Sequence, residues 1–197
     1  MIFSVQPTFL HDTRQLSLLP GRLTWSRPNG KEVVWEKEEI ESYRYKVEGI
    51  RGYAFWICRK YIIEICNHKQ EVVRIQLWSL YGLRRQVKYI AIIQTLNARY
   101  FNDMAVHYIQ LLGNDLSFAL WGVGLSPDGI ADAKLGEIPW QRLGIKPYAQ
   151  YFALYDLTDQ INYRAFEYGI DWNAGILQAV VEYATNRHMA FQSRQYE

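Results

Sequence analysis

The sequence lacks the residue combinations that mark the common catalytic and metal sites. Only two cysteines occur among 197 residues, and they do not form a C-x-x-C pair. The four histidines, His11, His68, His107 and His188, have no mutual spacing suited to a metal site. The chain also has no G-x-S-x-G elbow, H-E-x-x-H helix or phosphate-binding glycine loop. We therefore expect a non-enzymatic protein with no catalytic residue, no cofactor and no metal.

Long apolar segments are also absent. The longest, YAFWIC at residues 53–58 and YIAII at 89–93, are much shorter than the roughly 20 residues that a helix needs to span a bilayer. The start MIFSVQPTFLHD lacks the features of a secretory signal, namely a basic region, a sustained apolar run and a small-residue cleavage site. We therefore expect a cytoplasmic protein without a transmembrane segment. Cys58 and Cys66 lie in apolar, strand-like surroundings and are expected to be buried, with a disulfide as the less favoured alternative.

One short motif occurs twice. The residues Glu32, Trp35, Ile40 and Tyr43 reappear, each 105 positions later, as Glu137, Trp140, Ile145 and Tyr148. The repeat predicts two related units, residues 1–104 and 105–197, although periodicity alone equally allows one continuous sheet made by both halves. Because tryptophan buries a large area and often anchors a small β core, we expect Trp35 and Trp140 to be buried at equivalent positions.

The first unit has the pattern of a β meander followed by a helix. Short β-rich runs separated by turn residues extend from residue 22 to residue 78, and they begin with a hairpin whose strands are RLTWS and EVVWE. A helix is then predicted over residues 84–101, and its apolar face is expected to contain Val87, Ile90, Ile93 or Gln94, Leu96 or Asn97, and Tyr100.

The second unit repeats this order in a shorter form. Its closing helix is predicted over residues 172–187, with Asp171 as the N-cap. The apolar face of this helix is expected to contain Ile176, Ala179, Val180, Tyr183 and Ala184. Residues 103–124 are either a linker or additional strands. Aspartate at Ile90 or Val180 is expected to cost several kcal/mol, because it would place an unpaired charge in a core.

Antiparallel strands closed by one helix indicate an α+β fold. Both halves resemble bacterial pleckstrin-homology-like (PH-like) domains, in which a bent, roughly seven-stranded sheet or open barrel is capped by a C-terminal helix. The resemblance rests on three elements of each half. They are Leu23-Thr24, Val33-Val34-Trp35 and the first helix, and then Gly129-Ile130, Ile138-Pro139-Trp140 and the second helix.

Charge offers the clearest indications of a partner. Residues 1–104 carry 16 Lys and Arg against 10 Asp and Glu, whereas residues 105–197 carry 6 against 10. The opposite net charges either have no structural role or favour association, within one chain or between chains. The cluster of Arg84, Arg85 and Lys88 is either a solvated helix start or a contact for an acidic partner or lipid headgroup.

The favoured function is therefore an interaction or scaffold module that binds a protein. One alternative is a small-molecule-binding protein or enzyme with a pocket between the two units. Another is binding of anionic lipid headgroups, because some PH domains bind phosphoinositides through basic residues of their first hairpin, which here offers Arg22, Arg27 and Lys31. Nucleic acid is not expected, since the acidic second half would repel phosphates.

Overall fold

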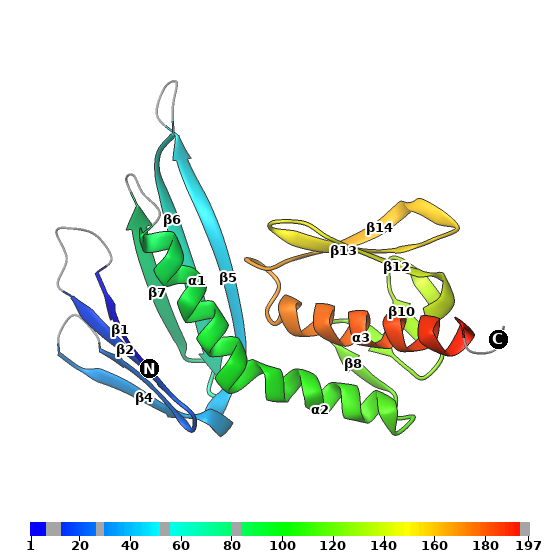
Figure 1. The fold of residues 1–197 in the computed structure, drawn as a ribbon, viewed down its shortest axis with the longest axis horizontal. Helices are drawn as coiled ribbons and strands as arrows, with labels where there is room; N and C mark the ends of the chain where they lie inside the picture. The colour runs from blue at the N-terminus through cyan, green and yellow to red at the C-terminus, as the bar shows by residue number, and fades with distance from the viewer. Residues whose placement is uncertain (7–12, 27–29, 52–55, 80–83, 194–197) are drawn as a thin grey trace. The chain divides into compact units, whose positions relative to one another are not determined.

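The chain folds as two compact units, Met1–Asn102 and Asp103–Glu197 (Figure 1). The structure, a computed structural model, describes residues 1–6, 13–26, 30–51, 56–79 and 84–193. Each unit combines helix with antiparallel sheets, as the α+β prediction requires. Over the described ranges, these sheets do not close into a barrel.

The first unit contains two antiparallel sheets joined by a short 3-10 helix, η1 (Lys37–Glu39). The four-stranded sheet has the order β1 (Ile2–Val5), β2 (Arg14–Leu19), β3 (Arg22–Ser26) and β4 (Glu32–Glu36). The three-stranded sheet has the order β5 (Ile40–Arg51), β6 (Trp56–Asn67) and β7 (Val72–Ser79). The predicted hairpin of RLTWS and EVVWE is confirmed, because Arg22 pairs with Glu36 and Ser26 pairs with Glu32.

The helical segment that follows contains three consecutive elements. They are α1 (Arg84–Leu96), a π turn η2 (Asn97–Phe101) and α2 (Asn102–Gly113), so helical structure is present over the predicted 84–101 and continues beyond it. The helix α1 contacts β6 and β7 of its own unit.

The predicted apolar face of this helix is correct at Leu96 and Tyr100, which are buried, and wrong at Val87 and Ile90, which are 63% and 42% exposed. In the first turns the buried side chains are instead Tyr89 and Ile92. Both pairs have helical spacing, so the period alone does not distinguish them. The ring of Tyr89 offers a larger apolar area than the side chain of Val87 or Ile90, and this favours its face for packing on the sheet.

The π turn fastens the end of this helix to the first unit. Arg99 donates a hydrogen bond to the Leu18 carbonyl over 2.7 Å, and the Tyr100 hydroxyl donates one to the Leu19 carbonyl over 2.6 Å. The ring of Phe101 stacks on Tyr43 with 3.8 Å between the ring centroids. A π turn accommodates one extra residue per turn, and here the adjacent Tyr100 and Phe101 are both buried.

Replacing Tyr100 with Phe is expected to lower the stability of the first unit by about 1 kcal/mol, because it removes a hydrogen bond. Burial raises the pKa of the Tyr100 hydroxyl to about 12, above the value of about 10 for tyrosine in an unfolded chain. The contribution of this hydroxyl is therefore complete below about pH 10 and is lost as the pH rises towards about 12. Urea unfolding at neutral pH and at about pH 11 measures the effect. The variant should lose less stability than the parent between these pH values, and an equal loss would contradict the assignment.

The second unit follows the same order of elements. A four-stranded sheet contains β8 (Phe118–Leu120), β9 (Val123–Leu125), β10 (Gly129–Asp132) and β11 (Gly136–Pro139). A 3-10 helix, η3 (Trp140–Arg142), leads to a three-stranded sheet of β12 (Leu143–Pro147), β13 (Tyr151–Asp156) and β14 (Asp159–Glu167). Residues 103–124 thus provide most of α2 and two strands. The second unit is shorter because β12 and β13 have 5 and 6 residues, whereas β5 and β6 have 12 each.

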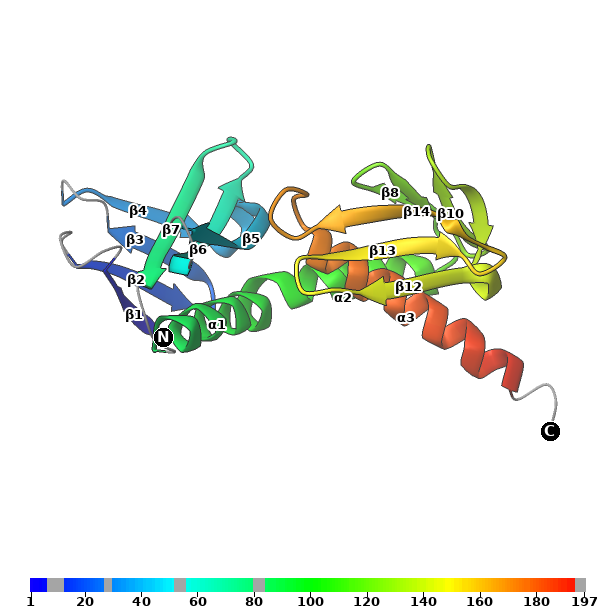
Figure 2. The ribbon, with the colours of Figure 1, turned by 90° about the horizontal axis from the view of Figure 1, so that it is seen from above.

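The closing helix α3 (Ala174–Ser193) covers the predicted 172–187 except for its first two residues. It contacts η3 and β12 and lies beside β12 in both views of the fold (Figure 2). Ile176, Val180 and Ala184 are buried as predicted, whereas Ala179 and Tyr183 are exposed. Leu177 and Val181 complete the buried face in their place.

Asp171 does not cap α3, contrary to the prediction. Helical structure starts at Ala174, and the Asp171 carboxylate instead accepts a hydrogen bond from the backbone N–H of Glu167 over 2.7 Å. Asp171 therefore closes the loop between β14 and the helix. Asn173, the residue directly before α3, is buried and has a positive φ of 57°.

The repeated motif occupies similar but shifted positions in the two units. Glu36 and Pro139, the residues before η1 and η3, have φ/ψ of −74°/156° and −67°/151°, and each 3-10 helix leads directly into a strand. These helices correspond at Lys37 and Trp140, not at Trp35 and Trp140. Both tryptophans are buried, as predicted, but Trp35 lies in β4 and Trp140 begins η3, so the residue-by-residue equivalence is wrong.

Candidate functional site

The predicted anion contact lies at the start of α1. Arg84 is the first residue of this helix, and Arg85 and Lys88 are partly exposed. The Lys88 ammonium donates a hydrogen bond to the Ser4 carbonyl in β1 over 2.7 Å, and Arg85 also has an interaction within the chain. Lys88 thus has a structural role, and an anionic contact by the three residues stays a prediction.

The basic first hairpin offers little free charge. Arg22 pairs with Glu36 over 3.3 Å, and Lys31 also has an interaction within the chain. Arg27 lies outside the described residues. The lipid alternative therefore gains no support from Arg22 or Lys31.

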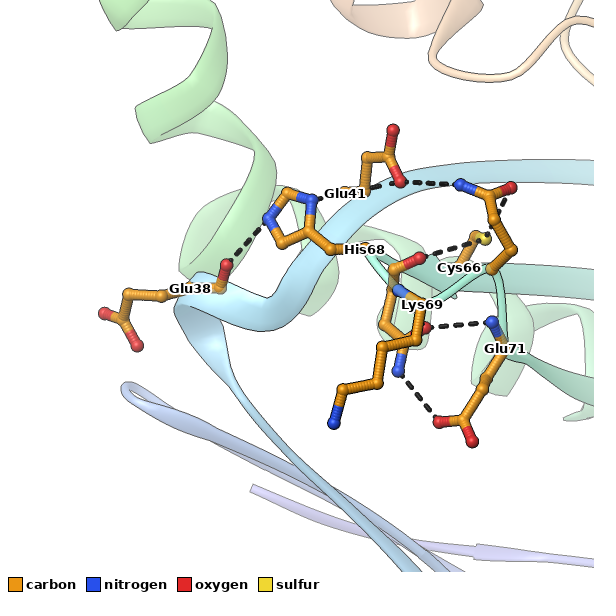
Figure 3. Close-up of polar contacts among 8 residues, drawn as sticks. Glu38, Glu41, Cys66, His68, Lys69 and Glu71 are labelled. Carbon is orange, nitrogen blue, oxygen red and sulfur yellow. Dashed lines mark hydrogen bonds and ion pairs between the residues drawn. The ribbon is translucent and has the colours of Figure 1, made fainter.

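A cluster of polar side chains surrounds the β6–β7 turn (Figure 3). The side-chain oxygen of buried Asn67 accepts hydrogen bonds from the backbone N–H groups of Lys69 and Glu71 over 3.0 and 2.9 Å. The Asn67 amide also donates to the Glu71 carboxylate over 2.9 Å. Asn67 therefore holds the turn closed, and Gln70 takes the left-handed conformation at φ 62°.

His68 joins this turn to the segment around η1. Its backbone N–H donates a hydrogen bond to the Glu39 carbonyl over 3.0 Å. Nε2 lies 2.9 Å from the Glu38 carbonyl oxygen, and because that oxygen can only accept, Nε2 carries the hydrogen and donates it. Nδ1 then faces the Glu41 carboxylate at 3.9 Å (Figure 3). These contacts fasten two segments of the first unit together, so His68 has a structural explanation.

Neither cysteine has the features of a nucleophile. Cys58 and Cys66 are both free and buried, which confirms the expected packing role. Burial raises the pKa of the Cys66 thiol, so its reactive thiolate form is disfavoured. Among the residues that the structure describes, no group of three or more His, Cys, Asp or Glu side chains is arranged to hold a metal ion.

Two aspartates of the second unit have structural partners that account for their carboxylates. Asp132 accepts hydrogen bonds from the backbone N–H groups of Lys134 and Leu135 and forms an ion pair with Arg164. Asp156 accepts hydrogen bonds from the backbone N–H and the hydroxyl of Thr158. These two hydrogen bonds, together with one from Arg142, lower the pKa of Asp156 to about 2. Both carboxylates organise turns of the second unit.

The most distinctive surface of the protein is the outer face of the β12–β13–β14 sheet. Side chains of a strand alternate between faces, and the inner face carries the buried Phe152, Leu154 and Phe166. On the outer face, two rows of paired residues cross the three strands. They are Gly144–Tyr155–Tyr163 and Lys146–Ala153–Ala165. The outer face therefore places tyrosine rings beside the small residues Gly144, Ala153 and Ala165.

Gly144 determines how one of these rings lies. A Cβ atom at this position would approach the ring of Tyr155 to 2.4 Å, so the ring rests directly on the backbone of β12. Nearby, Tyr148 and Tyr151 stack with 4.5 Å between their ring centroids. Packing thus orients three of the tyrosines before any partner binds.

These tyrosines line a hollow of about 270 Å³, here called the tyrosine basin. Its lining consists of Tyr148, Tyr151, Tyr155 and Tyr163 together with Lys146, Gln160 and Ala153. Tyr148 and Tyr163 are 42% and 47% exposed. Two further apolar side chains, Leu157 and Ile161, are exposed on the adjoining β13–β14 hairpin, and Ile161 is 92% exposed. An exposed apolar surface with a polar rim is typical of an interaction site.

Two lysines accompany the rings. The Lys146 ammonium lies 5.5 Å from the centre of the Tyr148 ring, and the Lys134 ammonium lies 5.4 Å from that of Tyr163. Lys134 also donates a hydrogen bond to the Tyr163 carbonyl over 2.7 Å. Lys146 therefore supplies positive charge to the basin, while Lys134 also supports the edge of β14.

A second hollow of about 660 Å³ lies on the β8–β11 sheet. Its floor includes Gly124 and Ala131, which are adjacent across β9 and β10, and its acidic lining residues are Asp128 and Glu137. Phe118 is the one aromatic residue among its described lining residues, and none of them is a lysine or arginine, so this groove lacks the tyrosine cluster and the basic charge of the tyrosine basin.

The repeated motif does not indicate the tyrosine basin, because it equates Tyr148 with Tyr43, which is buried. A usable signal was present in β13, where Tyr151, Ala153 and Tyr155 alternate with the core residues Phe152 and Leu154. Aromatic residues at alternate positions of an already amphipathic strand predict an aromatic outer face.

Comparison of the chain with protein-family models, with curated proteins and with solved structures finds no significant match. In the described part of the chain, no helix combines the length and the apolar character needed to cross a bilayer.

Proposed function

We propose that the protein is a non-enzymatic interaction module that docks on a protein partner through the tyrosine basin and the β13–β14 hairpin. The observation that carries this proposal is the gathering of four exposed side chains on the strands and turns of one three-stranded sheet, namely Tyr148, Leu157, Ile161 and Tyr163. Tyrosine supplies a large contact area at a low cost in conformational entropy, which is why it is common in protein-binding surfaces.

The size of the basin also favours a macromolecular partner. Pockets that enclose a drug-sized ligand have volumes of about 300–1,000 Å³, whereas the basin measures about 270 Å³. It accommodates one side chain of a larger molecule, with the exposed hairpin providing further contact area.

We also propose that each unit is a PH-like domain. Support comes from the shared order of four strands, a 3-10 helix, three strands and a helix in the described part of each unit. In such a domain the two sheets pack face to face and the C-terminal helix covers one open end. An experimental structure tests this proposal, and sheets that remain separate, with the helix on an outer face, would contradict it.

Quantitative affinity capture tests the docking surface. Tyr148→Ser combined with Tyr163→Ser should reduce recovery of the protein partner at least tenfold, because truncating central tyrosines of an interface costs more than about 1 kcal/mol each. Tyr183→Ser is the matched control, since Tyr183 has a similar exposure of 44% but lies on α3. The melting temperatures of all variants should stay close to that of the parent. Equal recovery by the double variant and the control would refute the proposal.

Gly144→Ala provides a test that replaces none of the residues lining the basin. The new methyl group must displace the Tyr155 ring, so partner binding should fall at least tenfold. The loss of stability should be only about 1 kcal/mol, because the displaced group is a partly exposed side chain. Calorimetry with the captured partner and thermal unfolding measure the two effects, and unchanged affinity would show that the Tyr155 position is irrelevant to docking.

A further inference from the structure

We propose that the tyrosine basin binds a carboxylate side chain, Asp or Glu, in an acidic segment of the partner. This inference rests on the proposed docking function and specifies the chemistry of the docked segment.

The groups that line the basin can donate hydrogen bonds. Its polar groups are four phenol hydroxyls, the Lys146 ammonium and the Gln160 amide, and all of them can donate hydrogen bonds. None of its described lining residues carries a carboxylate. A group that only accepts hydrogen bonds is therefore matched by this lining, and an ionised carboxylate is such a group.

The two lysines over the tyrosine rings favour an anionic ligand over a cationic one. Aromatic rings in a cluster attract cations, but here the rings of Tyr148 and Tyr163 already have the protein's own Lys146 and Lys134 over them. A cationic ligand would approach these two ammonium groups and be repelled. An anionic side chain would instead be attracted to Lys146, whose cation–π contact is compatible with a hydrogen bond to a ligand.

Among the described residues, the acids nearest Lys146 in the sheet do not form an ion pair with it. Asp156, on the same sheet, forms an ion pair with Arg142 and accepts hydrogen bonds from Thr158. Glu167 lies in β14, opposite Tyr151 in the strand register, and β13 separates it from Lys146 in β12. The local positive charge therefore persists although the second half of the chain is acidic overall.

The size of the basin and the exposed hairpin beside it indicate that the carboxylate belongs to a protein segment. The hollow of about 270 Å³ accommodates one side chain, and Leu157 and Ile161 on the adjoining hairpin offer apolar contact to its neighbours. An acidic segment with apolar residues next to its Asp or Glu fits both features.

Titration of the ¹⁵N-labelled full chain with defined peptides tests this inference. The probes are three blocked peptides of equal length in which valine alternates with Glu, with Gln or with Lys. The Glu peptide should shift the amide signals of Lys146, Ala153, Tyr155 and Tyr163, and the Gln and Lys peptides should not. Lys146→Gln should weaken binding of the Glu peptide at least fivefold. Lys69→Gln removes the same charge from an exposed site in the first unit and should leave the affinity at the basin unchanged.

Several outcomes would overturn the carboxylate assignment. Equal binding of the Glu and Gln peptides would remove the acidic requirement, and shifts confined to the first unit would show non-specific attraction to its basic surface. A peptide with phosphoserine in place of Glu that bound at least tenfold more tightly would reassign the basin to a phosphoryl group. Each of these results is distinguishable from failure of the docking function, which is read from partner recovery by the Tyr148/Tyr163 double variant.

Discussion

Replacing Ile92 with Asp is expected to prevent folding of the first unit, whereas the same substitution at Ile90 leaves the unit folded. Ile92 is fully buried on the face of α1 that contains Tyr89 and Leu96. An unpaired carboxylate there must be desolvated or protonated, at a cost of several kcal/mol. This penalty is comparable with the total stability of a small domain, about 5–15 kcal/mol.

Ile90→Asp is the matched control because it makes the same change two residues earlier in the same helix. Ile90 is 42% exposed, and the new carboxylate remains in water, so a change within about 0.5 kcal/mol is expected. Circular dichroism and urea unfolding of both variants measure the difference. Equal destabilisation by the two substitutions would show that α1 presents a different face to its sheet.

The second unit offers a parallel pair in α3. Val180 is fully buried, whereas the adjacent Ala179 is exposed. Val180→Asp should therefore unfold the second unit, and Ala179→Asp should not. The sequence-based expectation thus stands for Val180 and is wrong for Ile90.

These two positions illustrate what helical periodicity can predict. In α3 the residues Ile176, Val180 and Ala184 form one dominant apolar stripe, and the predicted face largely agrees with the observed one. In α1 the residues of two stripes are apolar, one through Val87 and Ile90 and the other through Tyr89 and Ile92. The spacing predicts a helix in both cases, but the choice between equivalent stripes depends on the sheet that the helix contacts.

In the repeat, the sequence likewise predicts the order of strands and helix but not which residues are equivalent in the two units. Turn residues and alternating apolar residues predict the succession of strands and helix in each half, because these signals are local. The identity of individual residues is a weaker guide, since any large side chain that reaches the core satisfies the packing. Tyr43 and Tyr148 therefore hold the same position in the motif, although Tyr43 is buried and Tyr148 is exposed.

The tyrosine basin depends on contacts that the sequence does not display. Its residues come from three strands, and they become neighbours only through the pairing of β12 with β13 and of β13 with β14. Strand register depends on turn geometry and on the burial of one sheet face. The sequence does not specify either of them at these positions. The outward direction of Tyr155 further requires a glycine on the neighbouring strand, a relation that no local motif expresses.

Gly129→Ala is expected to destabilise the second unit by about 3 kcal/mol or more, through a clash between backbones. Gly129 in β10 pairs with Pro139 in β11, and a Cβ atom at Gly129 would lie 2.2 Å from the Ile138 carbonyl oxygen. Since the obstructing atoms belong to the backbone, the two strands must separate to admit the methyl group. The separation would also disturb Trp140, which directly follows β11 and donates a hydrogen bond from its ring to the Ser126 carbonyl over 3.0 Å.

Gly124→Ala in the adjacent strand β9 is the control for this substitution. A Cβ atom at Gly124 would meet Ala131 at 3.5 Å, an ordinary van der Waals distance. The substitution should therefore be tolerated, or should stabilise the unit by about 0.4–1 kcal/mol, because alanine has less conformational freedom than glycine in the unfolded chain. Urea unfolding followed by tryptophan fluorescence compares the two variants. If they have the same stability, β10 and β11 do not approach as closely as described, and the position of Trp140 at the start of η3 requires another explanation.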